Sequence, residues 1–347
     1  MIRRSIVRAV LMAGALALAS GCGGRGGNVL NIFIWSEYLP DEIIQEFEKR
    51  TGVRVRYDTY DSNEALLEKL QSGVADYDLV VPSDYMVQIM IAEGLLKEID
   101  KSRISTWSHL DAKFLNKPFD PDNRYSMPYF WGTTGIGYNK QKFPEGVHSW
   151  AALFDEANAG RILMLDDVRE VFAVALKYLG RSANETDPDA LRQAADLLKR
   201  QKRLVKTYNS GDFHNILAAG DVDLAHGYNG QLASVVAAQP DRLGYAVPVE
   251  GAVIWMDSLC IPKKARNVEN AHAFMSFVME PEINARIVNA VRYASANKSA
   301  KKWIDPAILA DEAVYPPEEI IDRCEFLRDV GDAAVLYDQL WTEIKAQ

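Results

Sequence analysis

Segments typical of β-strands and of α-helices alternate through the first third of the chain, and this alternation limits the possible folds most. Each short apolar run is followed by a stretch with helical periodicity. The predicted strands cover residues 29–34, 53–57 and 79–81, and the predicted helices cover residues 40–50, 62–71 and 83–93. Parallel strands need crossover connections of this kind, so the pattern predicts an α/β fold whose parallel sheet is covered on both faces.

Residues at the predicted helix boundaries support this interpretation. Asp61 or Ser62 and Ser83 precede helical segments, where their side chains can accept hydrogen bonds from the first free N–H groups. Gly52 and Gly94 follow helical segments, where glycine readily adopts the left-handed conformation that ends a helix. The boundaries therefore agree with the hydrophobic pattern.

The chain of 347 residues exceeds the size of a single hydrophobic core, so we expect two lobes. An aromatic and β-branched run at 118–138, interrupted by Pro128 and Gly132, predicts a strand that leaves the first lobe, and 251–261 predicts a long returning strand. The expected lobes are residues 29–132 with 257–301, and residues 133–256 with 302–347. The other predicted elements are strands at 161–165 and 224–228 and helices at 168–179, 187–202, 212–219, 268–279, 281–289 and 332–344.

The amino terminus has the features of an export signal. Arg3, Arg4 and Arg8 precede the apolar run 9–19, which is shorter than the roughly 20 residues a membrane span needs. The LASGC sequence that ends at Cys22 resembles a bacterial lipobox, although Ala19 replaces the commoner leucine and leaves plain secretory cleavage open. We expect a signal peptide at 1–21, lipidation of Cys22, a flexible tether at 22–28, and a periplasmic protein anchored to a bacterial membrane.

Charge and composition exclude several classes of function. The net charge is −9, and removal of the three signal-peptide arginines makes it more negative, which disfavours nucleic acid as a partner. The five histidines form no HExxH or HxxxH pair, so no metal site and no cofactor are expected. Cys260 and Cys324 could form a disulfide or remain two free thiols.

Aromatic residues and carboxylates recur together near the ends of predicted strands. Trp35 is paired with Glu37, Asp84 with Tyr85, and Trp255 with Asp257. Alternate residues of a strand share a face, so a ring and a negative charge can point into the same space. An aromatic face attracts an ammonium group and a carboxylate adds a charge-assisted hydrogen bond, so this pairing suits an organic cation.

Longer motifs identify a family resemblance over nearly the whole chain after the signal. They are LNIFIWSEYLP from Leu30, DLVVPSDY from Asp78, KPFDPDNRYSMPYFWGTTGIGYN from Lys117, LDDVREVF from Leu165, IWMDSL from Ile254 and YPPEEI from Tyr315. The chain resembles the polyamine-binding proteins that feed bacterial spermidine/putrescine ABC transporters. The resemblance implies the type II periplasmic binding fold, two α/β lobes with crossing hinge strands and a ligand cleft between them, and an ABC permease as partner. We also expect a monomer.

The resemblance also implies which residues line the cleft. They are Trp35, Glu37, Tyr38, Ser83, Tyr85, Asp167, Glu170, Tyr228, Trp255, Asp257 and Tyr293, to which we add the adjacent Ser36 and Asp84. A linear polyamine alternates protonated amines with methylenes, so it needs acids at the amines and ring faces along the hydrocarbon. The acids of this set are expected to supply the charges and the aromatic residues the walls.

Two departures from the family bear on ligand length. Tyr228 stands where spermidine-preferring relatives have tryptophan, and Leu327 stands where they have glutamine. Asp84 occupies a position that is often uncharged and adds a carboxylate. Because four or five carboxylates exceed what a diamine needs, we favour spermidine over putrescine.

Other interpretations stay open from the sequence. Asp167 and Glu170 have the spacing of a helix capping box, and Asp166 is an alternative cap. The same two acids could serve a glycoside hydrolase as acid and base. A protein of the same fold could instead bind ferric ion through tyrosines, or an amino acid through an arginine such as Arg169.

Overall fold

The computed structural model describes residues 28–73 and 76–346. The predicted signal peptide (1–21), Cys22 and the predicted tether up to residue 27 lie outside this range, so these expectations stay predictions. Within the described residues, no helix combines the length and apolar character needed to cross a membrane.

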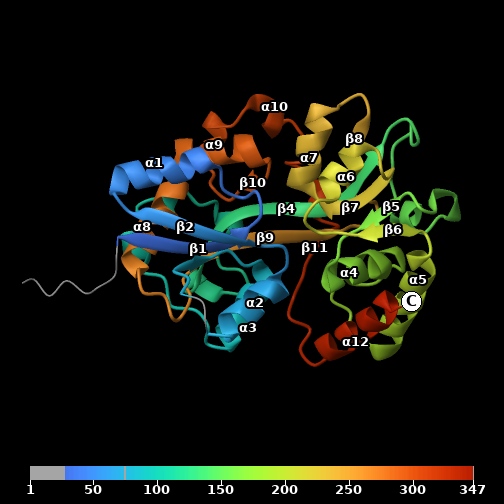
Figure 1. The fold of residues 1–347 in the computed structure, drawn as a ribbon, viewed down its shortest axis with the longest axis horizontal. Coiled ribbons are helices and arrows are strands. Elements are labelled where there is room, and N and C mark those ends of the chain that lie inside the picture. Colours follow the sequence, from blue (N-terminus) through green and yellow to red (C-terminus); the bar gives the residue numbers. More distant parts are fainter. Residues whose placement is uncertain (1–27, 74–75, 347) are drawn as a thin grey trace, which may run out of the picture.

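A single mixed sheet runs through the molecule and carries helices on both faces. The strand order is β2-β1-β3-β9-β4-β7-β5-β6, with β8 and β10 on β4 and β11 on β9. Figure 1 shows this sheet as a central layer, with α1, α9 and α7 on one side and α2, α3, α4 and α12 on the other. The expected parallel pairs are present, since β1 pairs in parallel with β2 and β3, and β5 with β6 and β7.

The first lobe contains the alternating segments predicted from the early chain. Its main elements are β1 (Val29–Trp35), α1 (Asp41–Thr51), β2 (Arg54–Tyr60), α2 (Asn63–Gln71), β3 (Leu79–Val80), α3 (Asp84–Ala92), α8 (Val268–Val278), α9 (Pro281–Val291) and β10 (Ala294–Ser295). Gly52 ends α1 in the left-handed conformation with φ of 70°, and the side chain of Ser62 caps α2. Ser83 precedes α3 as expected, but its side chain makes no capping bond.

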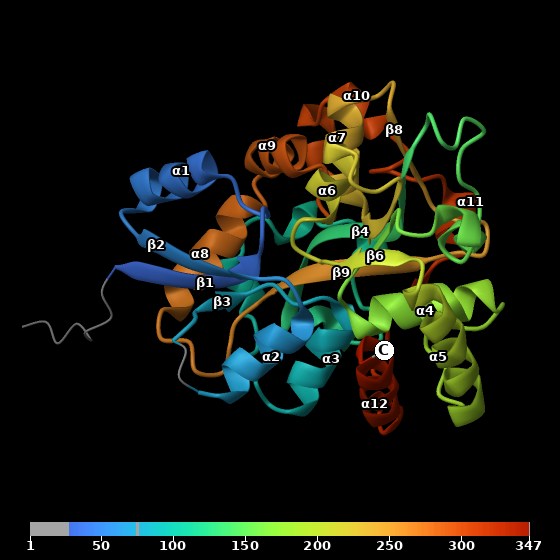
Figure 2. The same cartoon turned by 45° about the vertical axis from the view of Figure 1, so that its right-hand side comes forward.

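The second lobe repeats the combination of parallel strands and helices. Its main elements are β5 (Ile162–Met164), α4 (Val168–Tyr178), α5 (Pro188–Lys202), β6 (Val205–Tyr208), α6 (Phe213–Ala219), β7 (Leu224–Tyr228), α7 (Asn229–Ala238), β8 (Leu243–Ala246) and α12 (Ala333–Lys345). Asp187 caps α5, whose first residue is Pro188, and Gly220 ends α6 in the left-handed conformation. Figure 2 shows α4, α5 and α12 grouped below the sheet on this side.

Two long antiparallel strands, β4 (Ser126–Asn139) and β9 (Val253–Cys260), pass between the lobes. The first half of β4, up to Thr133, pairs with β9, whereas its second half, from Thr134, pairs with β7 and β8. One end of β9 reaches β3 through Cys260, and the other end pairs with β11 (Glu325–Phe326). The predicted strand at 118–138 begins only at Ser126, because a 3₁₀ turn occupies Pro121–Asn123.

Each lobe has its own apolar core. Phe47, Phe274 and Met256 belong to the first, and Phe172 and Tyr337 to the second. In the segment 302–347, the buried apolar residues from Ile304 to Leu327 belong to the first core. Those from Val330 onward belong to the second core. The predicted break at 301/302 stays a prediction, and this packing favours a later boundary. This segment also contains α10 (Pro306–Leu309) and α11 (Glu318–Ile321).

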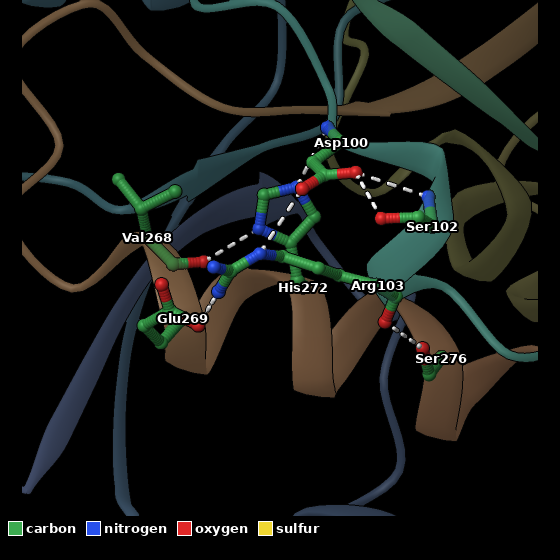
Figure 3. A network of polar contacts seen from close by, with 7 residues as sticks. All are labelled: Asp100, Ser102, Arg103, Val268, Glu269, His272 and Ser276. Carbon is green, nitrogen blue, oxygen red and sulfur yellow. Dashed lines mark hydrogen bonds and ion pairs between the residues drawn. The ribbon is translucent and has the colours of Figure 1, made fainter.

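A polar network fixes the segment after α3 to helix α8 (Figure 3). His272 accepts a hydrogen bond from the Asp100 backbone N–H at 3.0 Å, and its Nδ1 donates to the Val268 carbonyl at 2.9 Å. Arg103 adds ion pairs to Asp100 and Glu269. His272 is thus a neutral structural histidine. Cys260 at the end of β9 is buried, Cys324 just before β11 is partly buried, and both are free thiols.

Candidate ligand-binding cavity between the lobes

A cavity lies where the two lobes face each other, and the space within it and its open mouth amounts to about 630 Å³. Its lining contains every predicted site residue except Ser36 and Glu37. The lining residues are Trp35, Tyr38, Asp61, Asn63, Ser83, Asp84, Tyr85, Asp167, Glu170, Ser210, Tyr228, Gln231, Trp255, Asp257, Tyr293 and Leu327. The fold therefore brings together residues from most of the length of the described chain.

Strand ends and helix starts place these side chains. Trp35 ends β1, Tyr228 ends β7, Asp84 begins α3 and Asp167 immediately precedes α4. In open parallel sheets the carboxyl ends of the strands leave a crevice where ligands bind. Here the crevices of both lobes open into the same cavity.

Asp257 on β9 is buried and hydrogen-bonded on both carboxylate oxygens. The Ser83 hydroxyl donates to Oδ1 at 2.7 Å, and the Tyr38 hydroxyl donates to Oδ2. Burial raises the pKa of Asp257 to about 7, and these two hydrogen bonds act in the opposite direction. Its oxygens are thus held in fixed directions, and the charge gains stability when a cation arrives.

Asp84 and Glu170 are also buried, and burial outweighs the hydrogen bonds and the Arg169 charge that favour their ionised forms. The Asp84 Oδ1 accepts from the Tyr85 backbone N–H at 2.7 Å, but its Oδ2 has no partner. Glu170 accepts from the Thr134 hydroxyl at 3.0 Å. Burial raises the pKa of both carboxyl groups well above their ordinary values, and Asp257 and Asp167 respectively add charge repulsion.

Asp167 combines the capping role and the cavity position that the sequence left as alternatives. Its Oδ1 accepts from the backbone N–H groups of Arg169 at 2.9 Å and Glu170 at 3.1 Å, so Asp167 is the cap of α4. Asp166 does not cap the helix, because its carboxylate is ion-paired with Lys345 at 2.9 Å. Burial raises the pKa of Asp167, while the capping bonds lower it.

Aromatic rings form walls between the acids. The Trp255 ring meets Tyr293 edge-on at 5.3 Å between centroids and Tyr228 at 6.2 Å. The Trp35 indole N–H donates to the Val81 carbonyl at 2.8 Å, which fixes that ring. The indole N–H of Trp255 is buried without a partner. Trp35 is therefore held by a hydrogen bond, whereas Trp255 is held by packing.

Ser36 and Glu37 do not line the cavity, unlike the sequence-based prediction. Glu37 has a left-handed backbone with φ of 61°, and its side chain is 59% exposed. It accepts a hydrogen bond from Gln231 at 3.0 Å and lies 3.5 Å from His214 Nε2. Ser36 donates to Asp61 at 2.9 Å. The turn after β1 directs both side chains to the rim.

Besides Leu327, which the sequence indicated only for ligand length, four lining residues were not predicted from the sequence: Asp61, Asn63, Ser210 and Gln231. Asp61 and Asn63 follow β2, so the strand-end argument could have found them. Ser210 follows β6, a strand that the sequence pattern did not indicate. Gln231 lies on α7, also unpredicted, because this helix has an apolar sequence with little periodicity.

Arg169 is buried near the cavity, and its guanidinium lies over the ring of Tyr85, which lines the cavity. Its guanidinium donates to the Arg328 carbonyl at 3.0 Å and to Asn184 at 3.3 Å, and it stacks on Tyr337. It therefore does not supply a free cation for a ligand carboxylate. In the described part of the chain, no cluster of His, Cys, Asp and Glu side chains is arranged to hold a metal ion.

Comparison with known proteins places this architecture in a family. The family model for bacterial extracellular solute-binding proteins matches residues 42–316. The chain is 40% identical over 342 residues to the spermidine/putrescine-binding periplasmic protein of Escherichia coli K12, covering 98% of each. A solved spermidine/putrescine ABC transporter structure from Listeria monocytogenes has a TM-score of 0.88 and 37% identity, covering 92% of this chain and 99% of that one. The Tp0655 lipoprotein of Treponema pallidum has a TM-score of 0.83 and 31% identity, covering 92% and 100%.

These likenesses agree with the architecture described above. The predicted type II periplasmic binding fold is confirmed, since two α/β lobes joined by β4 and β9 face a common cavity. The curated relatives are binding proteins of transport systems and not enzymes, so the hydrolase interpretation is wrong. The chain belongs to the family of bacterial extracellular solute-binding proteins that includes the spermidine/putrescine-binding periplasmic proteins.

Proposed function

We propose that this protein captures a linear polyamine in the cavity between its lobes and delivers it to an ABC permease. Spermidine is the favoured ligand, with putrescine second. The proposed ligand-contacting residues are the predicted site residues that line the cavity. The relatives described above are named for the same ligands.

The observation that carries this proposal is the charge of the cavity wall. Among its described lining residues, five carry carboxylates and none is lysine or arginine. Four of these acids, Asp84, Asp167, Glu170 and Asp257, are buried. Buried carboxylates are costly unless a cation compensates them, and aromatic walls suit the methylenes between protonated amines. A polyamine supplies both features in one molecule.

Other ligands of the same fold fit less well. An amino acid needs a cation for its carboxylate, and Arg169 is committed to Arg328 and Asn184. Ferric ion needs phenolates, but burial raises the pKa of Tyr38, Tyr228 and Tyr293 and keeps them protonated.

The proposed preference for spermidine follows from the number of acids. Two ammonium groups of putrescine would leave several of the five carboxylates uncompensated, whereas spermidine adds a third charge and a longer hydrocarbon. Leu327 and Tyr228 both line the cavity, so their identities affect how long a ligand fits.

Calorimetric titration with putrescine, spermidine and spermine tests the proposal. We expect binding of all three or of the first two, with spermidine tightest. Glutamate and a disaccharide at equal concentration serve as controls and should not bind. Binding of a control without any polyamine would overturn the function, and putrescine tighter than spermidine would overturn the length preference.

The proposal includes a lipid anchor on Cys22, which would keep the protein beside its permease. It is supported by the lipobox-like sequence and by the Treponema relative, which is described as a lipoprotein. A Cys22→Ala variant should move from the membrane fraction to the soluble fraction of the cell envelope. An unchanged membrane fraction would show that the anchor is wrongly assigned.

A further inference from the structure

A second cavity adjoins the ligand cavity at Leu327, a residue of the first core that lines both spaces. Together with its open mouth it amounts to about 730 Å³, which is within the size range of ligand pockets. Its lining residues are Gln88, Lys117, Pro118, Phe119, Phe326, Leu327, Arg328 and Asp329. Apart from Leu327, none of them lines the ligand cavity, so the second cavity is a separate candidate site.

The two walls of the second cavity are attached to different lobes. Helix α3 and residues 117–119 form the wall that belongs to the first lobe. The facing wall, residues 326–329, is part of the chain that passes from β11 to α12 between α3 and α4 (Figure 1). Arg328 is tied to the second lobe, because its backbone N–H donates to Asn184 at 2.7 Å and its carbonyl accepts from Arg169 at 3.0 Å. A movement of one lobe relative to the other therefore changes the shape of the second cavity.

The lining combines apolar side chains with two cations. Lys117 is half-buried and Arg328 is exposed, and neither side chain takes part in an ion pair with another described residue. Asp329 is the one acid among the lining residues, and its Oδ1 accepts from the Gly331 backbone N–H at 2.8 Å. The apolar lining residues are Pro118, Phe119, Phe326 and Leu327. In a chain of net charge −9, this combination favours an anion with a hydrocarbon part.

We propose that the second cavity binds a small amphipathic carboxylate, a fatty acid of medium chain length. Lys117 and Arg328 pair with its carboxylate. Its hydrocarbon chain packs on Phe119 and Phe326. Because Lys117 belongs to the first lobe and Arg328 is tied to the second, the bound anion bridges the lobes.

This bridge couples the second cavity to the ligand cavity. The lobes of this structure touch across the ligand cavity, where the Tyr293 hydroxyl donates to Gln231 at 3.4 Å. A carboxylate that fits the second cavity in this closed arrangement stabilises the closed state, and it should therefore strengthen polyamine binding. The coupling rests on the proposed polyamine function, whereas the carboxylate site does not.

Calorimetric titration with decanoate, below the concentration at which it forms micelles, tests the site directly. Decanoate should bind at one site per chain. Butanoate keeps the charge but lacks six methylenes, so it should bind at least about tenfold more weakly. Saturating spermidine should not displace decanoate, because the acidic ligand cavity repels carboxylates. Equal affinity for the two acids, or displacement by spermidine, would overturn the site.

Substitutions in the lining test the assigned contacts. Lys117→Gln and Arg328→Gln should each weaken decanoate binding about fivefold, less than a buried charge-assisted bond would, because solvent screens both cations. Arg323→Gln removes an exposed cation outside the lining and is the matched control, which should bind like the wild type. Gln88→Trp should fill the cavity and abolish decanoate binding. Wild-type affinity in either charge variant, or in a folded Gln88→Trp, would contradict the placement.

Spermidine affinity with and without saturating decanoate tests the coupling. Linkage requires that each ligand raise the affinity for the other by the same factor, and we expect about fivefold, the lower end of typical couplings. The rise should disappear when Lys117→Gln and Arg328→Gln are combined. A rise that persists in this double variant would show that the two ligands pair in solution, and it would overturn the coupling.

The outcomes separate this inference from the proposed function. If the wild type binds decanoate but no polyamine, the proposed function is wrong and the carboxylate site stands. If it binds spermidine but no decanoate, the carboxylate site is wrong and the proposed function stands. If it binds both without mutual effect, the coupling between the cavities is wrong.

Discussion

Individual acids in the cavity are held in an unfavourable state that a cation would relieve. Asp257 has both oxygens hydrogen-bonded, whereas Asp84 has one oxygen buried with no partner. The pKa values of Asp84, Asp167, Glu170 and Asp257 are all raised, first by burial. Loss of solvation disfavours the ionised form of each carboxyl group. A ligand with several ammonium groups would stabilise the ionised forms, and this favours its binding.

Replacement of Asp257 by asparagine should separate binding from folding. Asp257→Asn keeps the size of the side chain but removes the charge, so the dissociation constant for spermidine should rise at least about tenfold. The melting temperature of the empty protein should change little, because the cost of the buried charge is also removed. Asp196→Asn on the exposed side of α5 is the control and should leave binding unchanged. Equal affinity for Asp257→Asn and wild type would show that Asp257 is not a ligand.

Polyamine affinity should fall as the pH is lowered from 8 to 5. Burial raises the pKa of Asp257 to about 7, from an ordinary value near 4, and it also raises the pKa values of Asp84, Asp167 and Glu170. Below pH 7 these carboxyl groups bind protons that a polyamine must displace. The empty folded protein holds protons that the unfolded chain releases between about pH 4 and 7, so these groups stabilise it as the pH falls through that range.

Calorimetry at several pH values, in two buffers of different ionisation enthalpy, measures both the affinity and the protons released. We expect proton release on binding near pH 6.5. A constant affinity from pH 8 to 5.5 without proton release would show that these acids are already charged in the empty protein.

Among the elements, the pair β4 and β9 both joins the lobes and carries part of the site. Trp255 and Asp257 lie on β9, and Gly132 on β4 lies directly opposite Trp255. A Cβ atom at Gly132 would lie 2.5 Å from the Trp255 ring and 2.1 Å from Asn229. The absence of a side chain at Gly132 thus leaves room for the Trp255 ring in its position at the cavity wall.

Gly132→Ala should therefore weaken both folding and binding. Overpacking of this kind costs about 1–3 kcal/mol of stability, and displacement of the Trp255 ring should lower polyamine affinity. Gly137→Ala on the same strand is the matched control, since its Cβ would come closest to Leu217 and Leu232, which belong to a smaller apolar cluster of the second lobe. Thermal melts and titrations should show destabilisation in both variants but weaker binding only in Gly132→Ala. Unaltered binding by a folded Gly132→Ala would contradict the link to Trp255.

At the scale of the whole molecule, we expect ligand binding and lobe closure to be coupled. The walls of the cavity come from both lobes, and contacts such as Gln231 with Glu37 and Tyr293 cross between them. A ligand that touches both lobes binds the closed state more tightly than the open one and shifts the population toward it. The acids of the cavity repel one another without a cation, so we expect the negative charge of the cavity to contribute to this difference.

Polyamine should accordingly stabilise the whole protein against heat. At a hundred times its dissociation constant, a ligand adds about 2.7 kcal/mol of stability, which corresponds to a rise in melting temperature on the order of 5 °C. Spermidine should produce this rise, and Mg²⁺ at the same concentration should not, because it cannot fill the aromatic part of the cavity. An equal shift with both cations would indicate general charge screening instead of a specific site.

Much of the fold was predictable from local signals. The alternating segments of the first lobe and helices such as α5 and α12 follow from hydrophobic periodicity and caps, which act over a few residues. Helix α7 was not predicted, because Asn229–Ala238 is apolar with little periodicity and its stability comes from packing against β4, β8 and α9. Strand β6 was missed for a similar reason, since it is short and only partly buried.

The sequence by itself determined the chemical character of the site: acids and rings at strand ends predict a cavity that suits an organic cation. Only the tertiary structure decided which of them face it. Glu37 turns to the rim because the backbone after β1 is left-handed and Gln231 and His214 from the other lobe hold its carboxylate. The orientation of Glu37 thus depends on contacts between residues almost two hundred positions apart in the sequence. These contacts form only when the two lobes have folded and face each other.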